Sequence, residues 1–326
     1  MDVIVNPTNK CNFNCSFCAA SKLCDKTITS KTTINLLKKF KKNLGQVIIN
    51  GGDPLVMPVS YYEDLISYLE SLDHYVSLSL TTNLWDFYRL PFKWKNVLSN
   101  NRVGVITSFQ YGTKRKLKSG ETFGEQKFRD IIELFNEVIG YKPNFISVID
   151  SDNEFSVIPT VKLAKNLGIK CKINKAIISG RQESYYPRYK IFKHYIDIIN
   201  LGLREYEMNI ELLTKYFSGK GTYCDIDRNC HNNLRVINPD GKLYTCSYTA
   251  ESESDSFRVD LHNRNVTKFP LMYNIIKKEC ISCPNYNLCN SCRIYIKEVL
   301  DNKDQDNYCY NMKQIIPELK EKCLSC

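Results

Sequence analysis

Hydrophobic residues follow two alternating patterns along the first 200 residues of the chain. Short runs of aliphatic and β-branched residues predict six strands, at 2–6, 46–50, 75–83, 102–110, 145–150 and 170–177. Between most of these runs, apolar residues recur every three or four positions, which predicts helices over 32–44, 61–72, 128–139 and 157–167. In the first of these helices, for example, one face carries Ile34, Leu37, Phe40 and Leu44.

The order of these elements predicts the fold class. A strand followed by a helix, repeated about six times, is typical of parallel strands joined by right-handed crossovers. A complete (β/α) barrel needs eight units, so six units predict an α/β fold with an open, partial (β/α)6 barrel of the TIM type. A helical, tyrosine-rich stretch follows at 188–206, and the sequence becomes turn-rich after about residue 221. We therefore expect a barrel domain over 1–205 and a second domain over 206–326.

Composition and charge narrow the functional classes. The 326 residues are 43% hydrophobic and 25% charged, which is typical of a soluble globular protein. No apolar run approaches the roughly 20 residues of a membrane span, and the N-terminus lacks a secretion signal, so we expect a cytoplasmic protein with no membrane partner. The net charge of +10 indicates either a lysine-rich solvated surface or attraction to an acidic partner. The lysines are scattered and no nucleic-acid-binding motif is present, which argues against a nucleic-acid partner.

Cysteines change this picture most. The chain has 15 of them, an odd number in an expected reducing compartment, which favours metal ligation over disulfides. Three of them, Cys11, Cys15 and Cys18, follow the first strand, at the expected C-terminal mouth of the barrel. Three thiolates can hold three irons of a 4Fe–4S cluster and leave the fourth iron open to a substrate or cofactor. A zinc site completed by Cys24 is the alternative.

The spacing Cys11-x-x-x-Cys15-x-Phe17-Cys18 resembles the signature of the radical S-adenosylmethionine (SAM) enzymes, including the aromatic residue before the third cysteine. The resemblance implies that SAM binds the open iron through its amine and carboxylate. It implies that one electron from the cluster cleaves SAM to a 5′-deoxyadenosyl radical, which abstracts a substrate hydrogen. An electron donor such as flavodoxin or ferredoxin is implied as a partner.

Further stretches resemble the positions that surround SAM in that family. "NGGDP" after the second strand is similar to the family's Gly-Gly-Glu-Pro motif, with Asp53 in place of Glu, although such a stretch is also an ordinary turn. Gln110 stands where relatives often carry Asp, and Arg181 could pair with the SAM carboxylate or form a structural ion pair. The cofactor-binding residues that the resemblance implies are Phe17, Gly51, Gly52, Asp53, Pro54, Asn83, Ser108, Gln110 and Arg181.

Ten of the 15 cysteines lie between Cys224 and Cys326, and their spacing resembles the SPASM domain of peptide-modifying radical SAM enzymes. One gap, between Cys289 and Cys292, is a residue shorter than usual. The resemblance implies two auxiliary 4Fe–4S clusters. The inner cluster would be held by Cys224, Cys230, Cys246 and Cys292, and the outer cluster by Cys280, Cys283, Cys289 and Cys309. Eight thiolates would also suit two zinc ions.

The chain ends in "CLSC", which contains Cys323 and Cys326. This pair is a candidate catalytic element, as a redox pair or as a hydrogen donor to a substrate radical, and a mobile tail is the alternative. A thiol donor would suit an epimerase, which returns a hydrogen to the opposite face of its substrate.

These resemblances imply a peptide maturase that crosslinks, epimerises or forms a thioether in a ribosomally made peptide, whose leader segment could be acidic. Ser247 follows Cys246, where sulfatase-oxidising relatives carry an acidic base, which argues against that branch. One alternative is a radical SAM enzyme that oxidises or rearranges a small molecule such as an amino sugar or nucleoside. Another is a zinc-binding interaction protein without redox chemistry.

Overall fold

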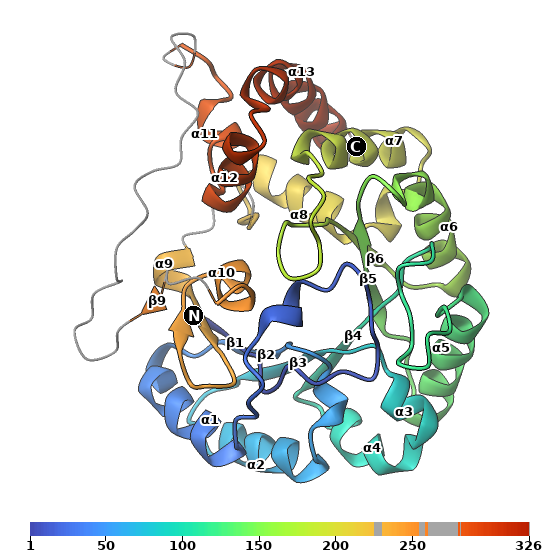
Figure 1. The fold of residues 1–326 in the computed structure, drawn as a ribbon, viewed down its shortest axis with the longest axis vertical. Coiled ribbons are helices and arrows are strands. Elements are labelled where there is room, and N and C mark those ends of the chain that lie inside the picture. The colour runs from blue at the N-terminus through green and yellow to red at the C-terminus, as the bar shows by residue number, and fades with distance from the viewer. Residues whose placement is uncertain (225–229, 254–257, 260–279, 281, 326) are drawn as a thin grey trace. The chain divides into compact units, whose positions relative to one another are not determined.

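The computed structural model describes residues 1–224, 230–253, 258–259, 280 and 282–325 (Figure 1). The chain forms two compact units, and each unit combines separate segments of the sequence. Unit 1 contains Met1–Phe145, Ser179–Glu183 and Asn229–Phe269, and unit 2 contains Ile146–Ile178, Ser184–Arg228 and Pro270–Cys326. The two units are defined by which segments pack together and not by their order in the chain. The boundary expected between residues 205 and 206 stays a prediction.

Six parallel strands form the main part of the sheet, as the sequence predicted, and they confirm the partial-barrel fold class. Their order in the sheet is β6-β5-β4-β3-β2-β1. The strands are β1 (Asp2–Val5), β2 (Gln46–Ile49), β3 (Ser77–Thr81), β4 (Val103–Ser108), β5 (Asn144–Ile149) and β6 (Cys171–Lys175). Beyond β1 follow the parallel strand β7 (Leu234–Ile237) and two antiparallel strands, β8 (Leu243–Tyr244) and β9 (Arg258–Val259).

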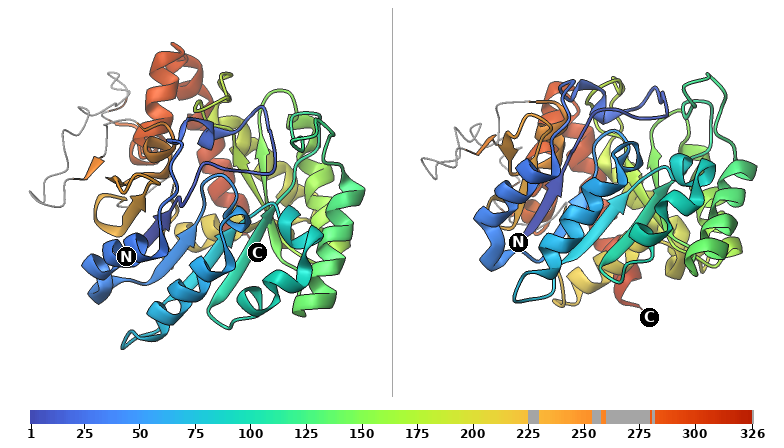
Figure 2. Two further views of the ribbon diagram at one scale, coloured as in Figure 1. Left: turned by 60° about the horizontal axis from the view of Figure 1, so that its bottom comes forward. Right: turned by 90° about the horizontal axis from the view of Figure 1, so that it is seen from below.

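The core of unit 1 lies between its sheet and its helices. Val3, Val47 and Leu78 are completely buried on neighbouring strands, and the burial of each side chain contributes roughly 1.5–3 kcal/mol. Helices of this unit lie outside the strands (Figure 1): α1 (Ser30–Leu37), α2 (Val59–Glu70), α3 (Trp85–Arg89), α4 (Pro91–Leu98) and α5 (Glu125–Ile139). Strands β1 to β4 are parallel, so their carboxyl ends share one edge of the sheet (Figure 2).

Two features of unit 1 differ in detail from the expectation. The helix predicted over 32–44 is α-helical only to Leu37, and it continues as a 3-10 helix over Lys38–Asn43. Two helices that the sequence analysis did not predict, α3 and α4, lie between β3 and β4. Pro91 separates them, because proline has no backbone N–H for an i to i−4 hydrogen bond and suits the first position of a new helix.

Unit 2 contains β6 and the helices α6 (Val157–Leu167), α7 (Arg188–Asn200), α8 (Met208–Phe217), α11 (Tyr286–Cys289), α12 (Arg293–Asp301) and α13 (Gln305–Leu324). Helix α13 has 20 residues and packs against α7 and α8. It tolerates Pro317 because the carbonyl of Lys313, which loses its helical N–H partner, accepts a hydrogen bond from the side-chain amide of Asn285 at 3.4 Å. No helix in the described part of the chain is long and apolar enough to cross a membrane.

A buried ion pair connects the end of β6 to α12 inside unit 2. Lys175 and Glu298 form this pair, with side chains only 3% and 7% exposed. The Lys175 ammonium also donates to the carbonyl of Ala176 at 3.1 Å and lies 4.6 Å from the centre of the Tyr295 ring. Glu298 accepts a second hydrogen bond, from the backbone N–H of Ile178 at 2.8 Å. Groups of the protein itself therefore compensate both the Lys175 ammonium and the Glu298 carboxylate.

Removing one partner of this pair should be strongly destabilising. We expect Glu298→Ala to lower the free energy of unfolding by about 3–5 kcal/mol, because Lys175 would stay buried without its counter-charge. Glu211→Ala is the matched control, since Glu211 pairs with Lys170 in the same unit at about 45% exposure, and such a pair contributes less than about 1 kcal/mol. Denaturant unfolding measures both variants, and equal losses would contradict this account.

Candidate active site

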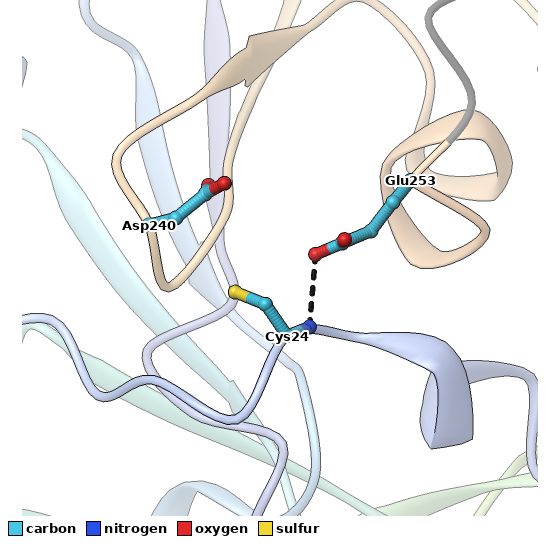
Figure 3. Close-up of side chains that lie close together, drawn as sticks. All are labelled: Cys24, Asp240 and Glu253. Atoms are coloured by element: carbon cyan, nitrogen blue, oxygen red, sulfur yellow. Dashed lines mark hydrogen bonds between the residues drawn. The ribbon is translucent and has the colours of Figure 1, made fainter.

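The loop after β1 carries Cys11, Cys15 and Cys18, all of them free thiols with intermediate exposure. Among the described residues, only Cys24, Asp240 and Glu253 bring three potential ligand atoms within 4.8 Å of one another (Figure 3). The three loop thiols therefore do not surround a single ion. Wider spacing suits an iron–sulfur cluster, in which each cysteine binds a different iron.

Cys24 lies in a different environment from the one the zinc alternative requires. Its side chain faces Asp240 and Glu253, and its backbone N–H donates to the Glu253 carboxylate at 2.8 Å (Figure 3). Asp240 also pairs with Lys242 at 2.8 Å. Cys24 thus contributes to a separate polar group and does not complete a set of four with the loop thiols.

Gly51 and Gly52 allow the end of β2 to lie directly on the cysteine loop. The N–H of Gly52 donates to the carbonyl of Thr8 at 2.9 Å, and that of Asp53 donates to Lys10 at 2.8 Å. A Cβ atom at Gly52 would lie 2.1 Å from the Lys10 oxygen, and one at Gly51 would lie 2.6 Å from the Thr8 oxygen. Gly51 also has a φ of 99°, in the left-handed region. Neither position can accept a side chain unless the loop moves.

Asp53 is a buried hydrogen-bond acceptor at the centre of this arrangement. Its carboxylate accepts from the backbone N–H groups of Leu55 and Asn83, at 2.9 and 2.7 Å, and from the Thr82 hydroxyl at 3.0 Å. Burial raises the pKa of Asp53 to about 6, and these donors act in the opposite direction. The carboxylate therefore stays charged at neutral pH and fixes the end of β3 against the end of β2. Pro54, which follows, is buried and begins a short 3-10 helix.

Asn83, after β3, contacts the same loop, and two further predicted site residues lie at the end of β4 and just after it. The Asn83 amide donates to the Asn12 side chain at 2.7 Å and to the sulfur of Cys11 at 3.6 Å. Gln110 is buried, and Ser108 accepts a hydrogen bond from Arg115 at 2.8 Å. Asn83 thus contacts a predicted iron ligand directly. The contact that Arg115 makes was not predicted from the sequence.

The segment after β6 holds the third cysteine. The N–H of Arg181 donates to the carbonyl of Cys18 at 3.1 Å, and its guanidinium donates to the Asn14 side chain and to the carbonyl of Cys15. Gly180 has a φ of 62°, and a Cβ atom there would lie 2.2 Å from the Cys18 oxygen. Arg181 therefore supports the loop, and Gly180 is a site residue that sequence reasoning missed, although "ISGR" contains it.

A hairpin of the loop after β4 pairs with the cysteine loop on another side. The N–H of Asn14 donates to the carbonyl of Lys116 at 2.8 Å, and that of Ser16 donates to Lys114 at 3.0 Å. Phe13 and Leu117 form a β-bridge between the same two segments. The lysine-rich sequence of this hairpin predicted only surface charge, and the pairing was not predicted.

The chemistry of the donor set fits an iron–sulfur cluster. Burial raises the pKa of Cys11 to about 12, and nearby Asp53 adds to the shift. Burial, followed by the neighbouring Cys15, also raises the pKa of Cys18. These thiols therefore keep their protons in the metal-free protein, and iron must displace those protons. Cys11, Cys15 and Cys18 would hold the cluster, and the glycine segments leave backbone groups close to where SAM would bind.

The outer set of C-terminal cysteines comes together within unit 2. Burial raises the pKa of Cys289 to about 11, and the charges of Cys283, Cys280 and Cys309 raise it further, which shows that the four side chains are electrostatic neighbours. The Asn290 amide donates to the sulfur of Cys289 at 3.1 Å. The inner set draws Cys230 and Cys246 from unit 1 and Cys224 and Cys292 from unit 2, and its common site stays a prediction.

The two cysteines at the end of the chain differ in what the structure describes. Cys323 is 1% exposed on α13, and its carbonyl accepts a hydrogen bond from Arg204 at 3.2 Å. A thiol buried in this way behaves as a core residue, so the structure does not support hydrogen donation by Cys323. Cys326 lies outside the described residues, and its role stays a prediction.

Comparison with known proteins identifies the family. The model of the radical SAM superfamily matches residues 5–184, more than half of the chain and the part that contains the cysteine loop. The chain belongs to the radical SAM superfamily. No curated protein matched the chain. The remaining likenesses are to solved structures.

Several of these structures contain the protein anSMEcpe, and two of them are similar at 18% identity and a TM-score of 0.70. The first, native anSMEcpe with bound AdoMet (SAM), aligns over 98% of both chains, and the second, with AdoMet and the Kp18Cys peptide, covers 100% of this chain and 99% of anSMEcpe. SuiB of Streptococcus suis bound to the precursor peptide SuiA is similar at 17% identity and a TM-score of 0.62, over 90% of this chain and 72% of SuiB. At such low identity the likeness concerns the fold.

Gly180 gives a direct test of how the third cysteine is held. We expect Gly180→Ala to lower bound iron and to reduce the free energy of unfolding by about 1–3 kcal/mol beyond any backbone strain, because its Cβ would collide with the Cys18 carbonyl. Gly202→Ala is the matched control, since Gly202 has a similar φ of 67° and no atom within 4 Å of its Cβ position. Both variants share the left-handed backbone cost of about 1–2 kcal/mol.

Iron content and anaerobic thermal unfolding distinguish the two effects. The account fails if the two variants lose equal stability and keep equal amounts of iron.

Proposed function

We propose that this protein is a radical SAM peptide maturase that modifies a ribosomally synthesised peptide. The observation that carries the proposal is the loop of Cys11, Cys15 and Cys18, held against the carboxyl ends of the strands by Gly51–Gly52 and by Gly180. When bound there, the cluster and SAM would supply hydrogen-atom abstraction. The protein itself would position the loop, exclude water and bind the substrate.

Residues around the loop would fix its geometry for this chemistry. Asn83 holds Cys11 through its amide, and Arg181 holds the carbonyl of Cys15. Asp53 connects the ends of β2 and β3 beneath them. Each of these contacts lowers the freedom of a thiol-bearing loop, which favours one cluster orientation over many.

A peptide substrate is supported by two observations. Cys283, Cys280 and Cys309 each raise the pKa of Cys289 by their charge, and such proximity is what an auxiliary cluster of the SPASM type would require. The fold is similar over nearly the whole chain to anSMEcpe and SuiB, which were solved with bound peptides. The +10 charge would attract an acidic leader segment, and equally an acidic electron donor of the flavodoxin or ferredoxin class.

The role of the cysteine loop is tested by SAM cleavage. Anaerobically reconstituted protein with dithionite and SAM should produce 5′-deoxyadenosine, and Cys18→Ala should lower the rate at least about 100-fold, because a lost ligand affects the cluster more than a lost outer-shell contact does. Cys24→Ala should retain activity, since that thiol belongs to the group with Asp240 and Glu253. Undiminished cleavage by Cys18→Ala would falsify the assignment.

The substrate class needs a second measurement. Peptides encoded by small reading frames beside the gene are incubated with the enzyme, SAM and reductant, and the products are analysed by mass spectrometry. Loss of two hydrogens would indicate a crosslink or thioether, and deuterium uptake from heavy water at unchanged mass would indicate epimerisation. Turnover of a nucleoside or amino sugar, with no peptide modified, would favour the small-molecule alternative.

The auxiliary cluster is tested by two substitutions on one helix. Cys309→Ala should remove up to about four iron atoms per chain, one cluster, because Cys309 belongs to the outer set. Cys323→Ala, also on α13, should keep all iron, because that side chain is buried in the helix packing. Iron analysis of anaerobic protein measures both, and equal iron in the two variants would exclude the outer cluster.

A further inference from the structure

Arg115 is a buried cation that the function described so far does not use. It lies on the lysine-rich hairpin that pairs with the cysteine loop, between Lys114 and Lys116, whose carbonyls accept hydrogen bonds from that loop. Only 5% of Arg115 is exposed, whereas Lys116 is exposed to solvent. The hairpin therefore turns one of its positive charges inward, toward the side on which the cysteine loop lies.

Two aromatic rings hold the guanidinium in place. Its central carbon lies 4.8 Å from the ring centre of Phe13 and 5.4 Å from that of Phe123, and these rings are 5.0 Å apart. One terminal nitrogen donates to Ser108 at 2.8 Å. Phe13 lies between Cys11 and Cys15 in the sequence, so the ring that packs against the guanidinium belongs to the cysteine loop itself. The position of this charge is thus fixed relative to the predicted iron ligands.

Among the described carboxylates, only that of Asp53, which lies nearby, partly balances the charge of Arg115, without forming an ion pair with it. Its Nε atom is buried without a hydrogen-bond partner, and none of the described carboxylates forms an ion pair with it. Burial lowers the pKa of Arg115, and its electrostatic neighbours, Cys15, Cys11, Asp53 and Cys18, act in the opposite direction. Three of these four neighbours are the predicted iron ligands.

A buried and incompletely paired cation is costly. Stacking on two rings offsets part of that cost, yet an apolar side chain such as Met would fill the same space without it. Cysteines bind iron as thiolates, so a cluster bound by Cys11, Cys15 and Cys18 would add negative charge close to this guanidinium.

We propose that Arg115 is the fixed counter-charge of the cluster held by Cys11, Cys15 and Cys18, and that it raises the reduction potential of this cluster. The proposal rests on the proposed function, because it requires that cluster. A [4Fe–4S]²⁺ core with three thiolates has a net charge of −1, and one electron from the external donor makes it −2. A positive charge at a fixed position stabilises the more negative state, so it favours reduction of the cluster and oxidation of the donor. Arg115 acts through the cluster and is therefore a positioning residue.

Removing the charge should lower the midpoint potential. The protein is reconstituted anaerobically and titrated without SAM, so that no contact with the cofactor carboxylate contributes. The signal followed is the paramagnetic resonance of the reduced cluster that is absent in Cys18→Ala. For Arg115→Gln we expect the ratio of reduced to oxidised cluster at a fixed solution potential to fall about tenfold, which corresponds to about 59 mV for a one-electron couple.

Two variants separate charge from shape. Arg115→Lys keeps a positive charge and should stay within about threefold of the wild-type ratio. Lys116→Gln removes an exposed positive charge from the neighbouring position of the same hairpin, and it should leave the ratio unchanged because water and salt screen exposed charges. If Arg115→Gln fails to assemble the cluster, Arg115→Met, which fills the space between the two rings, is titrated in its place.

The outcomes are distinct. A neutral variant with the cluster signal but an unchanged midpoint overturns the proposal, even if its affinity for SAM falls. If both neutral variants fail to assemble while Arg115→Lys assembles at the wild-type midpoint, the requirement for charge is supported. If Arg115→Lys also fails, the side chain is structural and the proposal is wrong. If no signal is lost in Cys18→Ala, the proposed function fails instead.

Discussion

The site depends on backbone hydrogen bonds that hold one loop from three sides. Gly52 donates to Thr8 from the end of β2, Arg181 donates to Cys18 from the segment after β6, and the hairpin after β4 accepts from Asn14 and Ser16. Without such partners the loop over residues 6–18 would sample many conformations, and ordering it costs roughly 1–2 kcal/mol per residue. Main-chain contacts can approach so closely only where no Cβ intervenes. This explains why two of the three supports contain glycine at the point of contact.

Two buried charges of opposite sign accompany this loop, and the protein treats them differently. The carboxylate of Asp53 receives donors from Leu55, Thr82 and Asn83, so its charge is solvated by the fold. The guanidinium of Arg115 has Ser108 and two rings, and its Nε remains without a partner. Hydrogen bonds from the protein therefore compensate the charge of Asp53, whereas the guanidinium of Arg115 keeps a donor that could bind a further anionic group. Both lie beside cysteines that would bind iron as thiolates, so a bound cluster would place further negative charge next to Arg115.

Strands, most helices and the cysteine loop could be predicted from the sequence because each has a local signal, either a periodic apolar pattern or a fixed spacing. The remaining parts depend on tertiary contacts. Arg115 lies among lysines, and a basic hairpin is indistinguishable from solvated surface until its pairing with the cysteine loop is seen. Gly180 is one glycine in a turn, and its role in supporting the cysteine loop becomes visible only from the proximity of the Cys18 carbonyl. Helix α13 was not predicted, and the amide of Asn285 that compensates Pro317 within it belongs to a residue 28 positions away from its acceptor Lys313.

The two groups of cysteines place different demands on the fold. The N-terminal loop is held by backbone hydrogen bonds with the strand ends and with the hairpin after β4. In the outer set, Cys309 lies on the long helix α13, whereas Cys289 ends α11, which has four residues. The Tyr308 hydroxyl donates to the carbonyl of Cys289 at 3.0 Å and connects the two helices. The segment around Cys280, Cys283 and Cys289 has little secondary structure of its own, so metal–thiolate bonds would contribute more to its stability. Iron would therefore contribute mainly reactivity at the N-terminal loop, and mainly folding free energy around the outer set.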